Sequence, residues 1–435
     1  MRQTILAALG ARRVRSLTMD DATLLHPKLR AVECVHVPDH GGGRALMLRD
    51  AEGIAPNPVV FSTELAPILA RFDGRRSVAT IAAEATLATG RTVEASLVAD
   101  LAAELDAAWM LDSEAFRARR GAVIAAFLAA EVRPAQHAGG AYPGEATALR
   151  RYIEDECLAH APARKGGSAI VGLTAPHMDL WRAAAGYGHA YRALADALPD
   201  DVDTLILLGT SHALMRRPFA VCAKAFATPL GALEPDREAI AALEKASRFD
   251  LRADEYLHKG EHSLEFQAVF LRHALAARYG HASAREPRIV PILCGLGEAQ
   301  ASGRDPALDG DAESFLVALG ELVERRCGRV LVVAGADLAH VGPRFGDAGP
   351  LDDRGRERLA QRDSESIALA VDRDAAGFFT QVQSDLDTRR VCGLGPIYTM
   401  LRVLPAAKGA RLHYAQHVDP DEGSIVSHAS LAYYA

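Results

Sequence analysis

The stretch AIVGLTAPHMD at residues 169–179 decides the fold of most of this chain. It opens with a continuous apolar run of strand length, Ala169–Leu173, and then changes to turn-forming and polar residues. Three similar runs follow at Thr204–Leu208, Arg288–Leu293 and Val330–Ala334, and long helical stretches separate them. Strands that are buried on both faces appear as unbroken apolar runs. The order therefore predicts an α/β domain with a mostly parallel central sheet flanked by helices.

Three of these runs are followed by side chains that can bind a metal ion or transfer a proton. His177 follows the first run, His212 follows the second in TLILLGTSHAL, and Asp337 and His340 follow the last in VLVVAGADLAHVG. In open α/β sheets, sites form at the carboxyl ends of the strands. We therefore expect His177 and His212 to face each other in one cleft, joined by Asp337, His340 or both.

This combination of residue types allows two kinds of chemistry. Imidazole and carboxylate groups suit iron, copper, zinc or nickel, and two histidines with one carboxylate form the usual non-haem iron site. Without a metal, the same groups can act as general acids and bases because histidine titrates near neutral pH. A lone histidine more often caps a helix or binds a carbonyl group. Three strand ends together favour a functional site with His177, His212, Asp337 and His340 as metal ligands.

The segment KGEHSLE, residues 259–265, precedes another predicted helix. With Ser263 as the N-cap, it can be a simple capping arrangement. Alternatively, His262 enters the cleft as a base or an additional ligand. We expect the catalytic residues to be His262, Glu265, Asp337 and His340.

Three further residues are weaker candidates for the same site. His137 lies in a Gly-rich turn and can line the pocket, and Asp179 can orient His177 from two residues away. Cys392 can place a thiol in the cleft, although a buried structural cysteine is the simpler interpretation.

The chain before this domain has a different pattern. Ala31–Val37 and Arg44–Arg49 predict strands joined by a PDHGGG turn, and helical periodicity follows, with Ser77 and Thr92 as N-caps. We expect four parts along the chain: an N-terminal extension at 1–30, a winged-helix-like domain at 31–112, a connecting helix at 113–132 and the α/β domain at 133–435.

Composition excludes several classes of protein. Lys and Arg total 49 against 56 Asp and Glu, and the net charge of −7 argues against a nucleic-acid partner. No run reaches the roughly 18 apolar residues of a membrane span. The six cysteines include no C-x-x-C pair, which fits a reducing compartment and predicts a cytoplasmic protein.

Nine motifs from residue 133 onward resemble, in their order, the Memo-like family, and most closely its bacterial branch, called AmmeMemoRadiSam system protein B. They are RPAQHAGGAYP, TAPHMDLWRAAAGYGHAYRAL, LILLGTSH, FATPLG, EHSLEFQAVFL, IVPILCG, AGADLAHVGPRFGD, RRVCGLGPIY and SIVSHASLAYYA. The resemblance implies a fold related to class III extradiol dioxygenases. It also implies partner proteins of the radical SAM and AMMECR types.

The same resemblance implies a set of metal ligands. In eukaryotic members the ligands are the histidines that map onto His177 and His212, together with a cysteine, and the histidine that maps onto His262 lies in the same cleft. We expect the cysteine position to fall at Ala339, which leaves Asp337 or His340 to supply the missing ligand. The implied cofactor is a divalent or redox-active metal ion, iron or copper first and zinc second.

Residues 68–111 are similar to PqqD-type peptide-recognition domains, through a helix ending in DG, the SVATI segment and a leucine-rich helix ending in WML. This resemblance favours peptide docking over DNA binding. Three functions follow from the whole sequence: a metal-dependent redox enzyme acting on a peptide, a protein or a small aromatic substrate, a metal-dependent hydrolase, and a non-catalytic peptide-binding adaptor.

Overall fold

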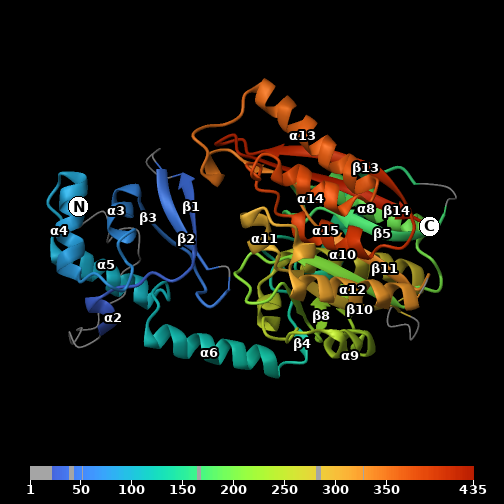
Figure 1. Cartoon of the computed structure of the whole chain (residues 1–435), viewed down its shortest axis with the longest axis horizontal. Coiled ribbons are helices and arrows are strands. Elements are labelled where there is room, and N and C mark those ends of the chain that lie inside the picture. Colours follow the sequence, from blue (N-terminus) through green and yellow to red (C-terminus); the bar gives the residue numbers. More distant parts are fainter. Residues whose placement is uncertain (1–21, 39–43, 51, 164–167, 281–285, 327) are drawn as a thin grey trace. The chain divides into compact units, whose positions relative to one another are not determined.

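The computed structural model describes residues 22–38, 44–50, 52–163, 168–280, 286–326 and 328–435 (Figure 1). Most of the turn expected at 38–43 and most of the expected N-terminal extension lie outside these residues. The chain divides into two units, residues 1–129 and 130–435. Within the described residues, no helix has the length and apolar character needed to cross a membrane.

The second unit is built on an eight-stranded sheet with the strand order β12-β14-β5-β11-β6-β10-β7, and β13 pairs with β14 (Figure 1). The four predicted strands are present and lie side by side in the middle of the sheet. The strands are β5 (Ile170–Ala175), β6 (Thr204–Thr210), β7 (Phe219–Val221), β10 (Arg288–Cys294), β11 (Val330–Gly335), β12 (His340–Val341), β13 (Lys408–Val418) and β14 (Ile425–Tyr434).

The sheet is mixed, so the expectation of a mostly parallel sheet is wrong. Only β5, β11, β6 and β10 pair in parallel. Strands β13 and β14 form an antiparallel pair joined by a short connection, and β14 then adds antiparallel to β5. A short connection can join only antiparallel neighbours, because a parallel pair needs a long crossover. This final hairpin was not among the predicted strands.

The register of the parallel strands brings three loops to one edge. Gly335 at the end of β11 pairs with Ala175 of β5 and with Gly209 of β6. The loops that leave these strands carry His177, His212 and Asp337, so the register places them next to one another.

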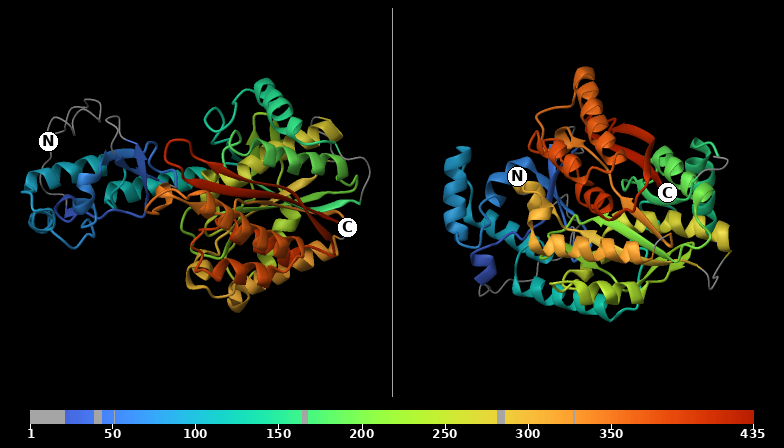
Figure 2. Two further views of the ribbon diagram at one scale, coloured as in Figure 1. Left: turned by 90° about the horizontal axis from the view of Figure 1, so that it is seen from above. Right: turned by 45° about the vertical axis from the view of Figure 1, so that its right-hand side comes forward.

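Helices cover both faces of this sheet (Figure 2). α8 and α10 pack on one face, and α15 packs on the other, where it contacts α12 and α14. The helices of this unit are α7 (Ala146–Tyr152), η2 (Ile153–Cys157), η3 (Leu158–His160), α8 (Ala184–Ala197), α9 (Arg237–Ala246), η4 (Glu255–Lys259), α10 (His262–Tyr279), α11 (Gly297–Ser302), η5 (Pro306–Leu308), α12 (Gly310–Arg325), η6 (Pro343–Phe345), α13 (Asp353–Val371), α14 (Ala375–Gln383) and α15 (Leu394–Val403). A small sheet is formed by β4 (Val132–Arg133), β8 (Ala225–Thr228) and β9 (Gly231–Leu233).

The first unit contains three antiparallel strands, one more than the sequence predicted: β1 (Glu33–Pro38), β2 (Arg44–Arg49) and β3 (Val59–Ser62). Its core joins Leu48 of β2 to apolar residues of the helices, among them Ile81 and Val98. The helices are α2 (Ala22–Leu25), η1 (Thr63–Leu65), α3 (Ala66–Leu69), α4 (Val78–Thr89), α5 (Ala95–Ala107) and α6 (Glu114–Ala129).

One of the two predicted N-caps in this unit is present. The Ser77 side chain accepts a hydrogen bond from the Thr80 amide at the start of α4. Thr92 does not cap α5, because that helix begins later and has Glu94 at its N-cap position. The expected connecting helix is α6, which ends at Ala129, before the short strand β4.

Candidate metal centre

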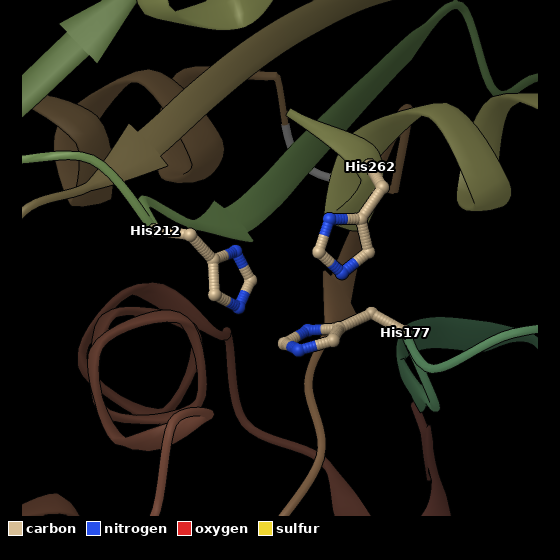
Figure 3. Close-up of side chains that lie close together, drawn as sticks. All are labelled: His177, His212 and His262. Atoms are coloured by element: carbon tan, nitrogen blue, oxygen red, sulfur yellow. The ribbon is translucent and has the colours of Figure 1, made fainter. Parts of the chain in front are cut away.

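Three histidines from distant parts of the second unit meet at one point (Figure 3). His177 follows β5, His212 follows β6 and His262 is the first residue of α10. One ring nitrogen of each lies within 4.8 Å of the others. In the part of the chain that the structure describes, this is the one group of three or more His, Cys, Asp or Glu side chains placed to share a metal ion. We call it the histidine group.

The imidazoles are held by hydrogen bonds that leave their other nitrogens available. Nδ1 of His177 lies 3.0 Å from the Gly335 carbonyl oxygen, to which it can only donate. Nδ1 of His212 lies 3.0 and 3.1 Å from the two oxygens of Glu261. In both rings Nε2 is therefore the nitrogen that can act as the ligand atom, and Figure 3 shows the rings turned toward one another.

The charge state of these groups suits a metal site. Desolvation, helped by the His212 and His177 imidazoles, holds the pKa of His262 well below its usual range. Burial raises the pKa of Glu261, but the neighbouring His212 and His262 outweigh it and keep that pKa well below its usual range. The centre therefore presents a neutral His262 imidazole beside an ionised carboxylate, and metal ligation requires neutral histidine.

A thiol and a second carboxylate border the histidine group. Cys392 Sγ lies 3.3 Å from Nε2 of His177. Asp337 accepts a hydrogen bond from the His177 backbone amide at 3.0 Å, and its other oxygen lies 3.7 Å from Nε2 of the same residue. Burial, followed by the Asp337 charge, raises the pKa of the Cys392 thiol well above its usual value, so the sulfur is protonated at neutral pH. Of the two interpretations of Cys392, a structural cysteine or a thiol in the cleft, this position favours the thiol in the cleft.

The structure does not bring Ala339 or His340 into the histidine group. Ala339 is fully buried in a small apolar cluster with Val341 and Ile425. Nδ1 of His340 lies 3.2 Å from the Leu338 carbonyl oxygen, and its ring packs edge-on against another side chain, Phe345. This segment runs as extended chain into β12 instead of turning helical. Asp337 and His340 therefore do not share a face: Asp337 contacts His177 directly, whereas His340 acts on the site only through electrostatic interactions.

Glu265 is also placed differently from its expected catalytic role. Both of its oxygens are engaged: it forms a fully buried ion pair with Arg133 and accepts the hydroxyl of Tyr142. It also accepts the backbone amides of Gln136 and His137, at 3.1 and 2.9 Å. These bonds give it a structural role, namely to fix the segment after β4 against α10.

Of two weaker candidates for site residues, one borders the histidine group and the other does not. The His137 ring lies 5.8 Å from the His262 ring, with Nε2 at 2.9 Å from the Gly260 carbonyl oxygen, so it borders the histidine group. Asp179 forms an ion pair with Arg182 and does not orient His177, whose Nδ1 is held by a backbone carbonyl.

The carboxylate that does support an imidazole is Glu261, which the sequence interpretation missed. It also takes the N-cap position of α10 that was assigned to Ser263: its side chain accepts from the Ser263 amide at 2.9 Å. The sequence did offer one indication of this role: Glu261 comes directly before His262, at the start of a predicted helix.

Two glycines allow the start of α10 to reach the strand ends. A Cβ atom on Gly335 would lie 2.4 Å from the Ser263 carbonyl oxygen, and one on Gly209 would lie 2.5 Å from the Ser263 hydroxyl. Neither distance is possible between real atoms, so a side chain at either position would push α10 away from β6 and β11. His262 is the neighbouring residue and would move as well.

We therefore expect Gly335→Ala to destabilise the protein by about 1–3 kcal/mol, as overpacking of a buried site does, and to weaken metal binding. Thermal unfolding and metal titration would measure the two effects. Gly310→Ala is the control, because a Cβ there meets no atom within 4 Å. Unchanged metal affinity in Gly335→Ala would show that the position of His262 does not depend on this contact.

Comparison with known proteins shows the family of this chain. Residues 133–432 match the family of Memo-like proteins. The chain belongs to the Memo-like family. A MEMO1 family protein of Aquifex aeolicus (strain VF5) is 28% identical over 395 residues, covering 90% of this chain and 96% of the relative. Another, from Thermococcus onnurineus (strain NA1), is 29% identical over 310 residues, covering 68% of this chain and 97% of the relative.

The two relatives differ in how far they extend. The second unit holds about 70% of this chain, so the Aquifex match must also include much of the first unit. The Thermococcus match covers 68% of this chain, which is about the length of the Memo-like region alone. The first unit therefore accompanies the Memo-like unit in at least one relative.

Proposed function

We propose that this Memo-like protein is a metal-dependent redox enzyme whose ion is held by His177, His212 and His262. The observation that carries the proposal is the meeting of three imidazoles whose ligand atoms lie within 4.8 Å of one another. Three protein ligands with room for another group are typical of catalytic metal sites. Imidazole nitrogens with a nearby thiol suit iron, copper or zinc.

The redox assignment is favoured by the thiol at the border of the site. Soft sulfur ligands select copper(I), zinc and iron–sulfur clusters, whereas hard ions such as magnesium prefer oxygen ligands. When bound, iron or copper would supply one-electron and oxygen chemistry. Cys392 is placed to act as a further ligand, with its sulfur 3.3 Å from His177 Nε2, and the carboxylate of Asp337 lies beside the same imidazole.

The substrate is proposed to be a peptide or protein delivered by the first unit, or a small aromatic molecule that enters the centre directly. A peptide is supported by the similarity of residues 68–111 to PqqD-type domains and by the presence of the first unit's counterpart in the Aquifex relative. A small aromatic molecule is supported by Trp181, a 63% exposed indole four residues after His177. Radical SAM and AMMECR-type proteins remain proposed partners.

A metal-dependent hydrolase is the second proposal, and it is favoured by the all-nitrogen histidine group. Three histidines with an open position also form catalytic zinc sites, where the ion lowers the pKa of a bound water. If no metal binds, the third function applies: the protein would be a non-catalytic adaptor that binds peptides.

Metal analysis of protein purified without oxygen separates these proposals. We expect the full-length chain to contain iron or copper bound in a fixed ratio to protein, and His262→Ala to lose most of it. His273→Ala is a matched control from the same helix, because His273 pairs with Glu154 instead of joining the histidine group. Zinc as the tightly held ion would favour the hydrolase. A protein that binds none of the three metals would contradict both enzymatic proposals.

A further inference from the structure

We infer that Glu261 is a positioning residue of the metal centre, whose single carboxylate orients both His212 and His262 toward the ion. The inference rests on the proposed metal site and extends it to a residue outside the ligand set. It predicts that removing one acceptor oxygen from Glu261 weakens metal binding while all three histidines remain.

The hydrogen bonds of Glu261 support this role. One oxygen accepts from the His212 backbone amide at 3.1 Å, and both lie within 3.1 Å of Nδ1 of the same residue. His262 is in electrostatic contact with the same carboxylate: its Nδ1 lies 3.4 Å from Oε1, an ion-pair distance. Thus the backbone and ring of one ligand and the ring of another face the same buried side chain, of which only 5% is exposed.

The chemistry of these contacts determines which ring nitrogen faces the ion. An ionised carboxylate can only accept hydrogen bonds, so the His212 imidazole, whose Nδ1 bonds to it, must carry its proton on Nδ1. Nε2 of His212 is then the unprotonated nitrogen, the form in which an imidazole ligates a metal. Carboxylates that bond to ligating imidazoles also raise their basicity, and losing such a partner typically costs about 10- to 100-fold in metal affinity.

His177 is supported in a different way. Its Nδ1 bonds to the neutral carbonyl oxygen of Gly335, a backbone atom that no side-chain substitution removes. Glu261 is therefore the side chain on which the orientation of the other two ligands depends.

The position of Glu261 at the start of a helix helps to stabilise its buried carboxylate. It is the N-cap of α10, a helix of 18 residues, and it accepts the Ser263 amide at 2.9 Å. The amino end of a helix stabilises a negative charge. Because capping alone could justify a glutamate here, the test must separate capping from ligand orientation.

The test is Glu261→Gln in the full chain, with Zn²⁺ or Co²⁺ titrated into the metal-free protein. Glutamine keeps the shape of the side chain but replaces one acceptor oxygen with a donor group. We expect affinity to fall by about 10- to 100-fold. We also expect the ¹⁵N chemical shifts of His212 to show loss of the fixed Nδ1–H tautomer, a change that capping alone would not produce.

Two further variants complete the design. Asp309→Asn changes the N-cap of α12, which accepts two backbone amides, and should leave metal affinity unchanged. Glu261→Asp keeps the charge and is an effective N-cap, but it is too short to reach both imidazoles, so it should fold and still bind metal more weakly than the natural protein.

The outcomes distinguish this inference from the proposed function. Wild-type affinity in both Glu261 variants, with unchanged tautomers, would overturn the inference and leave the metal site standing. If the natural protein binds neither ion, nor iron nor copper, the proposed function itself fails. Weaker binding in the Glu261 variants, with no change in Asp309→Asn, would support the positioning role.

Discussion

His177→Ala is expected to abolish tight metal binding. His177 has ring contacts with both other members of the histidine group, at centroid distances of 5.3 Å to His212 and 5.4 Å to His262. Without it two imidazoles remain, whereas tight sites usually offer three or four ligands. Loss of an outer-shell partner alone costs about 10- to 100-fold, so loss of a ligand should weaken affinity by more than about 100-fold.

Calorimetric titration of the metal-free protein would measure this effect. His340→Ala is the informative control, because His340 is close in sequence to Asp337 but turns its ring toward Phe345. We expect its metal affinity to be nearly unchanged. If His340→Ala loses the metal and His177→Ala keeps it, the ion is not held by the histidine group.

The second large effect is expected for Glu265→Ala, and it concerns stability. The change would leave Arg133 as an unpaired charge in a position with no solvent exposure. Breaking a buried ion pair by removing one partner costs about 3–5 kcal/mol, and Tyr142 would lose its hydrogen-bond acceptor as well. The free energy of unfolding in urea should fall by at least that amount, which is a large part of the stability of an ordinary domain.

Asp155→Ala provides the matched control for an ion pair. Asp155 pairs with Arg151 on the surface, where both side chains are more than half exposed. Exposed pairs of this kind contribute about 0–1 kcal/mol. Equal losses of stability in the two variants would contradict a structural role for Glu265. A loss of activity in Glu265→Gln with full stability would restore its catalytic interpretation.

The central strands could be predicted because their signal is local. Each of β5, β6, β10 and β11 is a short apolar run, and burial on both faces requires that composition whatever the rest of the chain does. The placement of His177 and His212 followed from the same runs, since parallel strands bring their carboxyl ends to one edge.

The partners of these histidines could not be predicted in the same way. Cys392 is 215 residues from His177, and the structure brings the two together because α15 packs against β11 and β6. His340 shows the opposite case: it is three residues from Asp337, but the extended chain turns it away from the site. Distance along the sequence did not indicate which side chains meet.

The α/β class of the second unit, its family and the two histidines that follow adjacent strands could all be read from the residues alone. The mixed sheet, the place of His262 in the histidine group, and the contacts of Cys392 and Glu261 with that group became visible only in the folded chain. The difference arises because the first set depends on local composition and the second on contacts between distant segments. A strand that is buried on both faces requires an apolar residue at each of its positions, so its composition alone indicates it. A site instead depends on strand register, on how helices pack, and on close contacts between segments far apart in the chain, such as the contact between Gly335 and Ser263.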